Sequence, residues 1–218
     1  MLLSKRNAPP RKRLSKENLL LKGVPYEYIE GTLNDYVYDD EIKELFKNYI
    51  SNLHDMYEDR INLCLYGSNG AGKTFLSSLI VKEAYRLRYN SALITLQNLI
   101  DLNFKYSKTI EDYAKLKMIN ESHFLVIDEV GKETFTKTGS NINLLEETLR
   151  NAITKGQVII LCTNLPLEGE GGLYEQYGTS IQSLIDGSFV KVEFNNADYR
   201  PVVLHQKKAL KLLLGEEE

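Results

Sequence analysis

The chain has 218 residues, of which 43% are hydrophobic and 26% are charged. This composition is typical of a globular protein with one domain of good core size, and it excludes a disordered or fibrous chain. No apolar run approaches the roughly 18 residues of a transmembrane helix. The first residues also lack an apolar core of signal-peptide length, so we expect a cytoplasmic protein with no membrane partner.

The net charge of −3 conceals an uneven distribution along the chain. Residues 1–22 carry a net charge of +6, whereas the remainder carries −9. With Pro9, Pro10 and little apolar patterning, residues 1–22 are predicted to be a flexible basic arm that becomes ordered on binding DNA or an acidic partner. A solvated tail without a role is the alternative. The candidate nucleic-acid contacts of this arm are Arg11, Lys12 and Arg13.

A lead-in rich in aromatic and turn-forming residues follows at 23–37. Asp39 and Asp40 then supply acids suited to the N-cap and first turn of a helix. Apolar side chains recur at helical spacing beyond them, which predicts an amphipathic helix over about 40–56. Its apolar stripe is expected to pack into the core.

The most informative stretch lies between a predicted buried strand at 61–66 and a predicted helix start near residue 75. It fits G-x-x-x-x-G-K-[ST], the phosphate-binding P-loop, in the strand–loop–helix context that this motif requires. Its glycines let successive backbone N–H groups point at phosphates, and the helix N-terminus adds positive partial charge. Lys73 adds a full charge for the β- and γ-phosphates, and the Thr74 hydroxyl can ligate Mg²⁺. The predicted nucleotide-binding residues are Gly67, Ser68, Asn69, Gly70, Ala71, Gly72, Lys73, Thr74 and Phe75.

The alternation of helix and strand continues beyond the P-loop. The helix is predicted to run to about residue 88, and a second strand follows at 92–96. Residues 97–120 are predicted to be helical with a break at 103–108. Basic and aromatic residues interleave at this break, a pattern suited to single-stranded nucleic acid, with an exposed loop of ordinary lysines as the alternative. The candidate contacts are Lys105, Tyr106 and Lys108.

A second chemical landmark is the apolar run 123–127, which ends in Asp128 and Glu129. An apolar strand that ends in two acids is the Walker B pattern, and in a parallel sheet such acids lie at the carboxyl edge, where ligands bind. Asp128 is predicted to hold Mg²⁺, and Glu129 to orient and activate the attacking water. An acidic strand end without chemistry is the alternative. Further candidates for nucleic-acid contact follow at Lys132, Phe135 and Lys137.

The next two predicted elements continue the alternation of helix and strand. A helix over about 142–153 is predicted to end with Gly156 as its C-cap. A buried strand at 157–162 then leads into Thr163 and Asn164, polar residues that could touch the γ-phosphate or the attacking water.

A Gly-rich loop, a helix that includes 177–185 and a last strand at 189–194 complete the alternation. Strand–helix alternation of this kind predicts an α/β fold with helices on both faces of a parallel sheet. Cys64 and Cys162 fall in predicted buried strands, so we expect two free thiols in a reducing compartment.

Three segments together resemble one family of ATPases. Residues 126–133, Val-Ile-Asp-Glu-Val-Gly-Lys-Glu, are close to L-[LV]-I-D-[DE]-[LV]-G-x-E. The lead-in from Gly23 to Tyr36 and the closing Phe-Asn-Asn-Ala-Asp-Tyr-Arg at 194–200 add to the likeness. These segments are similar to those of bacterial helicase loaders of the DnaC/DnaI kind and of IstB transposition ATPases.

The resemblance implies a P-loop NTPase of the AAA+ type over residues 23–200, with a tail at 201–218 that is too short for a full helical lid. It makes Asn164 similar to the sensor 1 residue and Arg200 similar to the sensor 2 arginine, and with Lys73 and Glu129 these are the predicted catalytic residues. It also implies ATP and Mg²⁺ as cofactors, ATP-controlled self-association, contact with single-stranded DNA and delivery of a replicative helicase onto DNA.

One departure from the family concerns arginine. Members usually carry an arginine in the helix before the last strand, where it reaches into a neighbour's ATP site. No arginine lies between Arg150 and Arg200 in this sequence, and Lys191 is a weak substitute. Because such an arginine raises hydrolysis by several orders of magnitude, we expect slow hydrolysis alone, or an arginine lent by a partner.

Three other functions stay open beside helicase loading. The first is a transposition helper ATPase that chooses target DNA for a transposase. The second is a nucleotide-bound adaptor with negligible hydrolysis, which the absent arginine favours and Glu129 disfavours. The third is a small-molecule or nucleotide kinase, which the arginine-poor second half disfavours.

Overall fold

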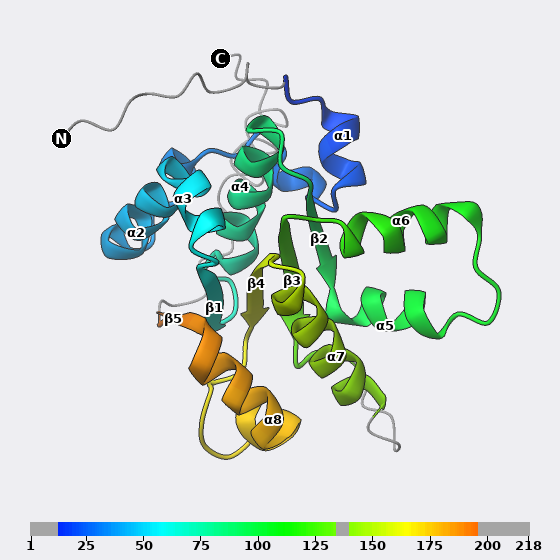
Figure 1. Ribbon diagram of the computed structural model, residues 1–218. Helices are drawn as coiled ribbons and strands as arrows, with labels where there is room; N and C mark the ends of the chain where they lie inside the picture. The colour runs from blue at the N-terminus through cyan, green and yellow to red at the C-terminus, as the bar shows by residue number, and fades with distance from the viewer. Residues whose placement is uncertain (1–12, 134–139, 196–218) are drawn as a thin grey trace, which may run out of the picture.

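A computed structural model describes residues 13–133 and 140–195 (Figure 1). Its centre is a sheet in the order β2-β3-β4-β1-β5, in which every neighbouring pair of strands is parallel. Each predicted strand is found within one residue of its expected bounds, because short apolar runs stand out where a parallel sheet is covered on both faces. The strands are β1 (Asn62–Gly67), β2 (Ser91–Thr95), β3 (Phe124–Val130), β4 (Val158–Thr163) and β5 (Phe189–Phe194).

Helices flank this sheet, as the predicted α/β fold requires (Figure 1). The predicted break at 103–108 separates α5 from α6, and the helix expected over 40–56 is divided at Asn52 into α2 and α3. Within the described ranges, no helix combines the length and apolarity needed to cross a bilayer. The helices are α1 (Lys16–Leu21), α2 (Asp40–Ser51), α3 (Leu53–Glu58), α4 (Lys73–Arg86), α5 (Leu96–Phe104), α6 (Ile110–Asn120), α7 (Ser140–Thr154) and α8 (Leu173–Ser188), with short 3₁₀ turns η1 (Tyr26–Tyr28) and η2 (Leu33–Asp35).

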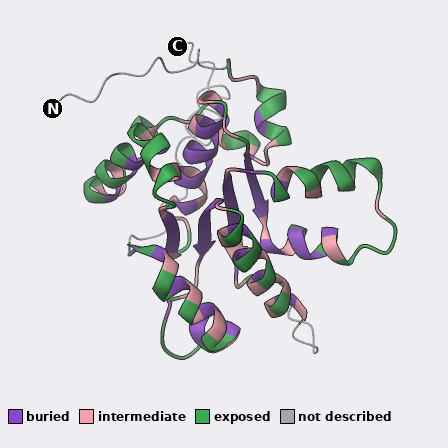
Figure 2. Ribbon diagram, in the orientation of Figure 1, coloured by how far each residue is buried: buried purple, intermediate pink, exposed green. Residues whose placement is uncertain are grey.

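Side chains that alternate along the strands build a separate core on each face of the sheet. Leu63 and Leu65 of β1 pack with Ile80 of α4 in one core, whereas Cys64 belongs to the other. Figure 2 shows the result, with buried strands at the centre and exposed residues on the outer sides of the helices. Cys64 and Cys162 are buried in different cores as free thiols.

The structure corrects the domain boundary expected at residue 22. Residues 16–21 form α1, in which Leu19 is only 1% exposed and belongs to the core. The Leu93 N–H of β2 donates a hydrogen bond of 2.8 Å to the carbonyl of Lys22. A Cβ on Gly23 would lie 1.9 Å from the carbonyl oxygen of Leu93, so the chain passes directly against the sheet there. A helix this short shows too few periodic positions for sequence reasoning to find it.

Candidate functional site

The predicted P-loop connects β1 to α4 at the carboxyl edge of the sheet (Figure 1). Gly67 has φ +111° and Gly72, the N-cap of α4, has φ +91°, and both conformations favour glycine. A Cβ on Gly67 would lie 2.4 Å from the carbonyl oxygen of Phe194, and one on Gly72 would lie 2.7 Å from Cε2 of Tyr36. The loop is therefore confined between the end of β5 and the lead-in.

Tyr36 is a support of the P-loop that sequence reasoning did not assign to the site. Its side chain is fully buried, its hydroxyl donates to the carbonyl of Ala71 at 3.4 Å, and its ring lies 5.2 Å from that of Tyr38. Nearby, the ring of Phe75 lies 5.5 Å from that of Tyr28. The unusual density of aromatic residues in the lead-in was the signal that could have found this packing.

Lys73 lies inside the loop rather than in solvent. Its side-chain ammonium donates to the carbonyl oxygens of Gly67 at 2.9 Å and Ser68 at 2.6 Å. Burial lowers the pKa of Lys73 to about 8, although the nearby Asp128 favours the charged form. An anion beside the Lys73 ammonium would favour its charged form and offset this lowering of the pKa. The loop therefore fits a phosphate, with exposed Ser68 and Asn69 on its outer side.

Asp128 and Thr74, the two predicted Mg²⁺ ligands, are brought together from different elements. Asp128 lies near the carboxyl end of β3 and is 5% exposed, and burial raises the pKa of its carboxyl group. Hydrogen bonds from the Thr74 side chain and from the Glu129 N–H act in the opposite direction. Hydroxyl and carboxylate oxygens are the donors that Mg²⁺ prefers, usually beside several waters and substrate phosphates. The residues present therefore fit this ion.

Glu129 lies near the carboxyl end of β3 in an unusual backbone conformation. Its φ is +57°, and the register between β3 and β4 shifts between Ile127 and Val130. Irregularities of this kind re-aim side chains beside active sites. The half-exposed Glu129 carboxylate is paired with the ammonium of Lys132 at 2.8 Å. The structure thus places Lys132, a predicted nucleic-acid contact, at the nucleotide site.

Asn164 follows β4, the strand beside β3. The preceding Thr163 is buried, and its hydroxyl donates to the carbonyl of Val130 at 2.7 Å while it accepts the Leu165 N–H at 3.1 Å. Thr163 thereby ties the loop that carries Asn164 to the end of the Walker B strand. The partly buried Asn164 is placed at the same edge as Asp128.

The predicted nucleic-acid candidates at 103–108 form the outer end of the α5–α6 hairpin, which projects from the body of the domain (Figure 1). Lys105 pairs with Asp112 at 2.5 Å and lowers the pKa of that carboxyl group to about 2. Lys108 donates to the carbonyls of Asn103 and Lys105. Tyr106 is fully exposed. Phe104, which lies in the predicted break, is also exposed. Sequence reasoning missed two further exposed apolar side chains of the hairpin, Ile110 and Tyr113.

Other predicted residues are not brought into the nucleotide site by the described part of the chain. Arg13 is exposed ahead of α1. The Lys191 ammonium, the weak substitute for arginine, forms an ion pair with Asp186 at 2.9 Å, which raises the pKa of Lys191. The predicted residues that lie outside the described ranges are Arg11, Lys12, Phe135, Lys137 and Arg200.

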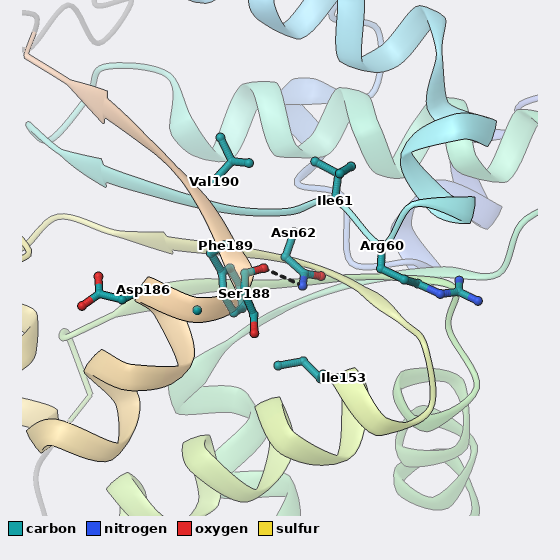
Figure 3. A pocket seen from close by; sticks show the side chains of 9 residues that line it. Arg60, Ile61, Asn62, Ile153, Asp186, Ser188, Phe189 and Val190 are labelled. Carbon is teal, nitrogen blue, oxygen red and sulfur yellow. Dashed lines mark hydrogen bonds between the residues drawn. The ribbon is translucent and has the colours of Figure 1, made fainter.

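A hollow of about 440 Å³ lies at the amino edge of β1 and β5, away from the P-loop (Figure 3). Asn62 projects toward it, but its side-chain amide already donates to the carbonyl of Ser188 at 3.0 Å and its oxygen accepts the Ile159 N–H at 2.8 Å. These bonds join β1, β4 and the end of α8. The polar groups of Asn62 therefore have a structural role there.

The P-loop, the Walker B acids and the parallel sheet define a P-loop NTPase of the AAA+ type. The sequence of residues 1–187 matches the family of IstB-like ATP-binding proteins, and the chain belongs to this family. The resemblance to the DnaC/DnaI and IstB group is thereby confirmed. No curated protein matches the sequence.

Solved structures share the fold at low sequence identity. The DnaC helicase loader superposes with a TM-score of 0.63 at 19% identity, over 78% of this chain and 99% of that one. DnaI gives 0.58 at 17% identity, over 79% of this chain and 94% of that one. The replication initiator DnaA, bound to AMPPCP and single-stranded DNA, gives 0.59 at 18% identity; the match covers 89% of this chain but only 58% of DnaA.

Proposed function

We propose that this chain hydrolyses ATP and acts in DNA replication by loading or remodelling a replicative helicase on single-stranded DNA. The observation that carries the ATPase part is the meeting of Lys73, Thr74, Asp128 and Glu129 at one point of the carboxyl edge. Binding of a nucleotide with Mg²⁺ needs only Lys73, Thr74 and Asp128 of these four. The Glu129 carboxylate is not needed for binding, and its role would be to activate the attacking water for hydrolysis.

The side chains suggest how the site would work. Backbone N–H groups of the P-loop and the α4 N-terminus would receive the phosphates, and Lys73 would exchange the carbonyls of Gly67 and Ser68 for phosphate oxygens. Thr74 and Asp128 would hold Mg²⁺, which neutralises charge on the β- and γ-phosphates.

Hydrolysis further requires Glu129 to leave Lys132 and accept a proton from the water, with Asn164 orienting that water. Lys191 is engaged with Asp186, so we expect slow turnover until a second copy or a partner supplies an arginine.

The α5–α6 hairpin supports contact with single-stranded DNA. Tyr106 and Tyr113 expose aromatic rings on which bases could stack, and Lys105 and Lys108 lie in the same connection. Both lysines are engaged with groups of the hairpin itself, so a DNA phosphate would have to displace Asp112 from Lys105. We therefore expect stacking on Tyr106 to contribute more to affinity than either lysine.

A transposition helper is the second candidate, because the family that matches residues 1–187 is named for IstB. Both candidates need the same ATPase site and contact with DNA, and they differ in the protein that is delivered. Binding of the purified chain to the purified replicative helicase and, separately, to a transposase from the same organism would decide between them. Binding to the transposase alone would exclude helicase loading.

Hydrolysis is tested by measuring phosphate release with and without single-stranded DNA. Wild type should exceed Glu129→Gln under at least one condition, whereas Glu58→Gln, at an exposed position that ends α3, should match wild type. Equal background rates in all three proteins would exclude the ATPase proposal and favour a nucleotide-bound adaptor.

A further inference from the structure

The turn that follows the Walker B acids is fixed by groups from two distant parts of the chain. The Lys132 N–H donates to the Glu129 carbonyl at 3.1 Å, with Gly131 at φ +93° between them. The Gly131 N–H donates to Oε2 of Glu133 and to the hydroxyl oxygen of Tyr177, each at 2.9 Å. The Tyr177 hydroxyl in turn donates to Oε1 of Glu133. Glu133, Tyr177 and the Gly131 amide therefore form a closed hydrogen-bonded triangle.

This triangle is buried. Glu133 is 5% exposed and Tyr177 is 2% exposed. Burial and the adjacent carboxylate raise the pKa of Tyr177, so its hydroxyl keeps the proton that it donates. A carboxylate at this depth is costly unless it is hydrogen-bonded, and its two oxygens here receive the Gly131 amide and the Tyr177 hydroxyl.

Helix α8 is bent directly after Tyr177. Gly178 has φ +83° and ψ 175°, a conformation open essentially to glycine alone. A Cβ on Gly178 would meet nothing within 4 Å, so the backbone conformation, rather than crowding, requires glycine. The part of α8 after the bend packs Ile181 and Ile185 into the core, while the part before it brings Tyr177 to the Gly131 turn. The bend at Gly178 therefore directly follows the residue that contacts the Walker B turn.

We propose that Glu133 and Tyr177 are positioning residues that hold the turn at Glu129 in the conformation needed to aim its carboxylate at the attacking water. This inference rests on the proposed ATPase function. It gives a role to the last acid of the Gly-Lys-Glu sequence at 131–133 and to a tyrosine 44 residues beyond it. It also makes the first half of α8 part of the hydrolysis site.

Two single-atom deletions test this proposal. Tyr177→Phe removes the hydroxyl in the triangle and keeps the buried ring. Tyr174→Phe is the matched control on the same helix, because its hydroxyl also donates to a carboxylate, that of Asp186 at 2.8 Å. Both should lower the Tm, Tyr177→Phe by more because its hydroxyl is bonded to a buried carboxylate. Only Tyr177→Phe should lower kcat, by about tenfold, because small displacements of a catalytic group are costly; its Kd for a fluorescent ATP analogue should stay within about twofold of wild type.

A second pair of variants tests whether kcat depends on the Glu133 oxygen that accepts the Gly131 N–H. Glu133→Gln keeps an oxygen for the Gly131 amide and should retain kcat within about threefold of wild type, whereas Glu133→Ala should lose about tenfold or more. Equal losses in both variants would contradict a positioning role and indicate that the charge itself is needed.

The outcomes distinguish this inference from the proposed function. If Glu129→Gln abolishes hydrolysis and Tyr177→Phe leaves kcat unchanged, the positioning role is wrong and the ATPase proposal stands. If Tyr174→Phe lowers kcat as much as Tyr177→Phe, the effect is general destabilisation and the positioning role is again wrong. If wild type and Glu129→Gln both show only the background rate, both proposals fail together.

Discussion

Gly67 begins the P-loop in a conformation and at a distance that alanine cannot match. Its φ is +111°, and a Cβ would lie 2.4 Å from the Phe194 carbonyl oxygen. Two other glycines allow the effect of the backbone conformation to be separated from the effect of the steric contact. Gly169 has φ +87° with nothing within 4 Å of a Cβ, so alanine there adds backbone strain alone. Gly187, inside α8, has neither positive φ nor a close neighbour, so alanine there adds neither.

The expected changes in the free energy of unfolding follow from these features. Gly187→Ala should stabilise the protein by about 0.5–1 kcal/mol through helix propensity. Gly169→Ala should destabilise it by about 1–2 kcal/mol, the cost of a left-handed conformation. Gly67→Ala adds displacement of Phe194, whose carbonyl accepts the Ser68 N–H at 2.8 Å. Loss of that bond costs about 0.5–1.5 kcal/mol, which brings the total to about 1.5–3.5 kcal/mol.

Urea unfolding measures the three free energies, and titration with a fluorescent ATP analogue measures binding. Gly67→Ala should weaken nucleotide binding by about tenfold or more, because the Ser68 and Asn69 amides move with the loop. Gly169→Ala and Gly187→Ala should bind as wild type does. If Gly67→Ala matches Gly169→Ala in both stability and affinity, the approach of Phe194 does not constrain the loop and the reasoning is refuted.

Two further predictions concern α1 and Lys73. Leu19→Ala should destabilise the protein by about 2–5 kcal/mol, whereas Leu21→Ala, at a side chain 71% exposed, should change stability by less than about 0.5 kcal/mol; similar urea midpoints for the two would show that α1 is not part of the core. Because burial lowers the pKa of Lys73 to about 8 and a bound phosphate favours its charged form, nucleotide affinity measured in EDTA should be nearly flat from pH 7 to 8. It should then fall by up to about tenfold per unit above pH 8. An affinity that stays constant to pH 9.5 would contradict this assignment.

Most of the fold could be predicted because the elements carry strong local signals. Strands β1, β2, β3 and β4 are largely apolar runs, and the P-loop and the Walker B acids mark two strand ends whose position at the carboxyl edge follows from a parallel sheet. Helix α1 was not predicted because a helix of six residues shows little periodicity in its sequence. The exposed Ile110 and Tyr113 were not predicted either, since apolar residues at helical spacing normally indicate a core face.

The sequence by itself determined the chemistry at Gly67 to Thr74 and at Asp128 and Glu129, because phosphate and Mg²⁺ binding need particular residue types at fixed local spacing. Only the tertiary structure decided how these residues are held. Phe194 and Tyr36 confine the loop from segments far away in the chain, and Tyr177 reaches the Gly131 turn across a bend in α8. Contacts between distant segments depend on strand order and helix direction, which local spacing does not encode.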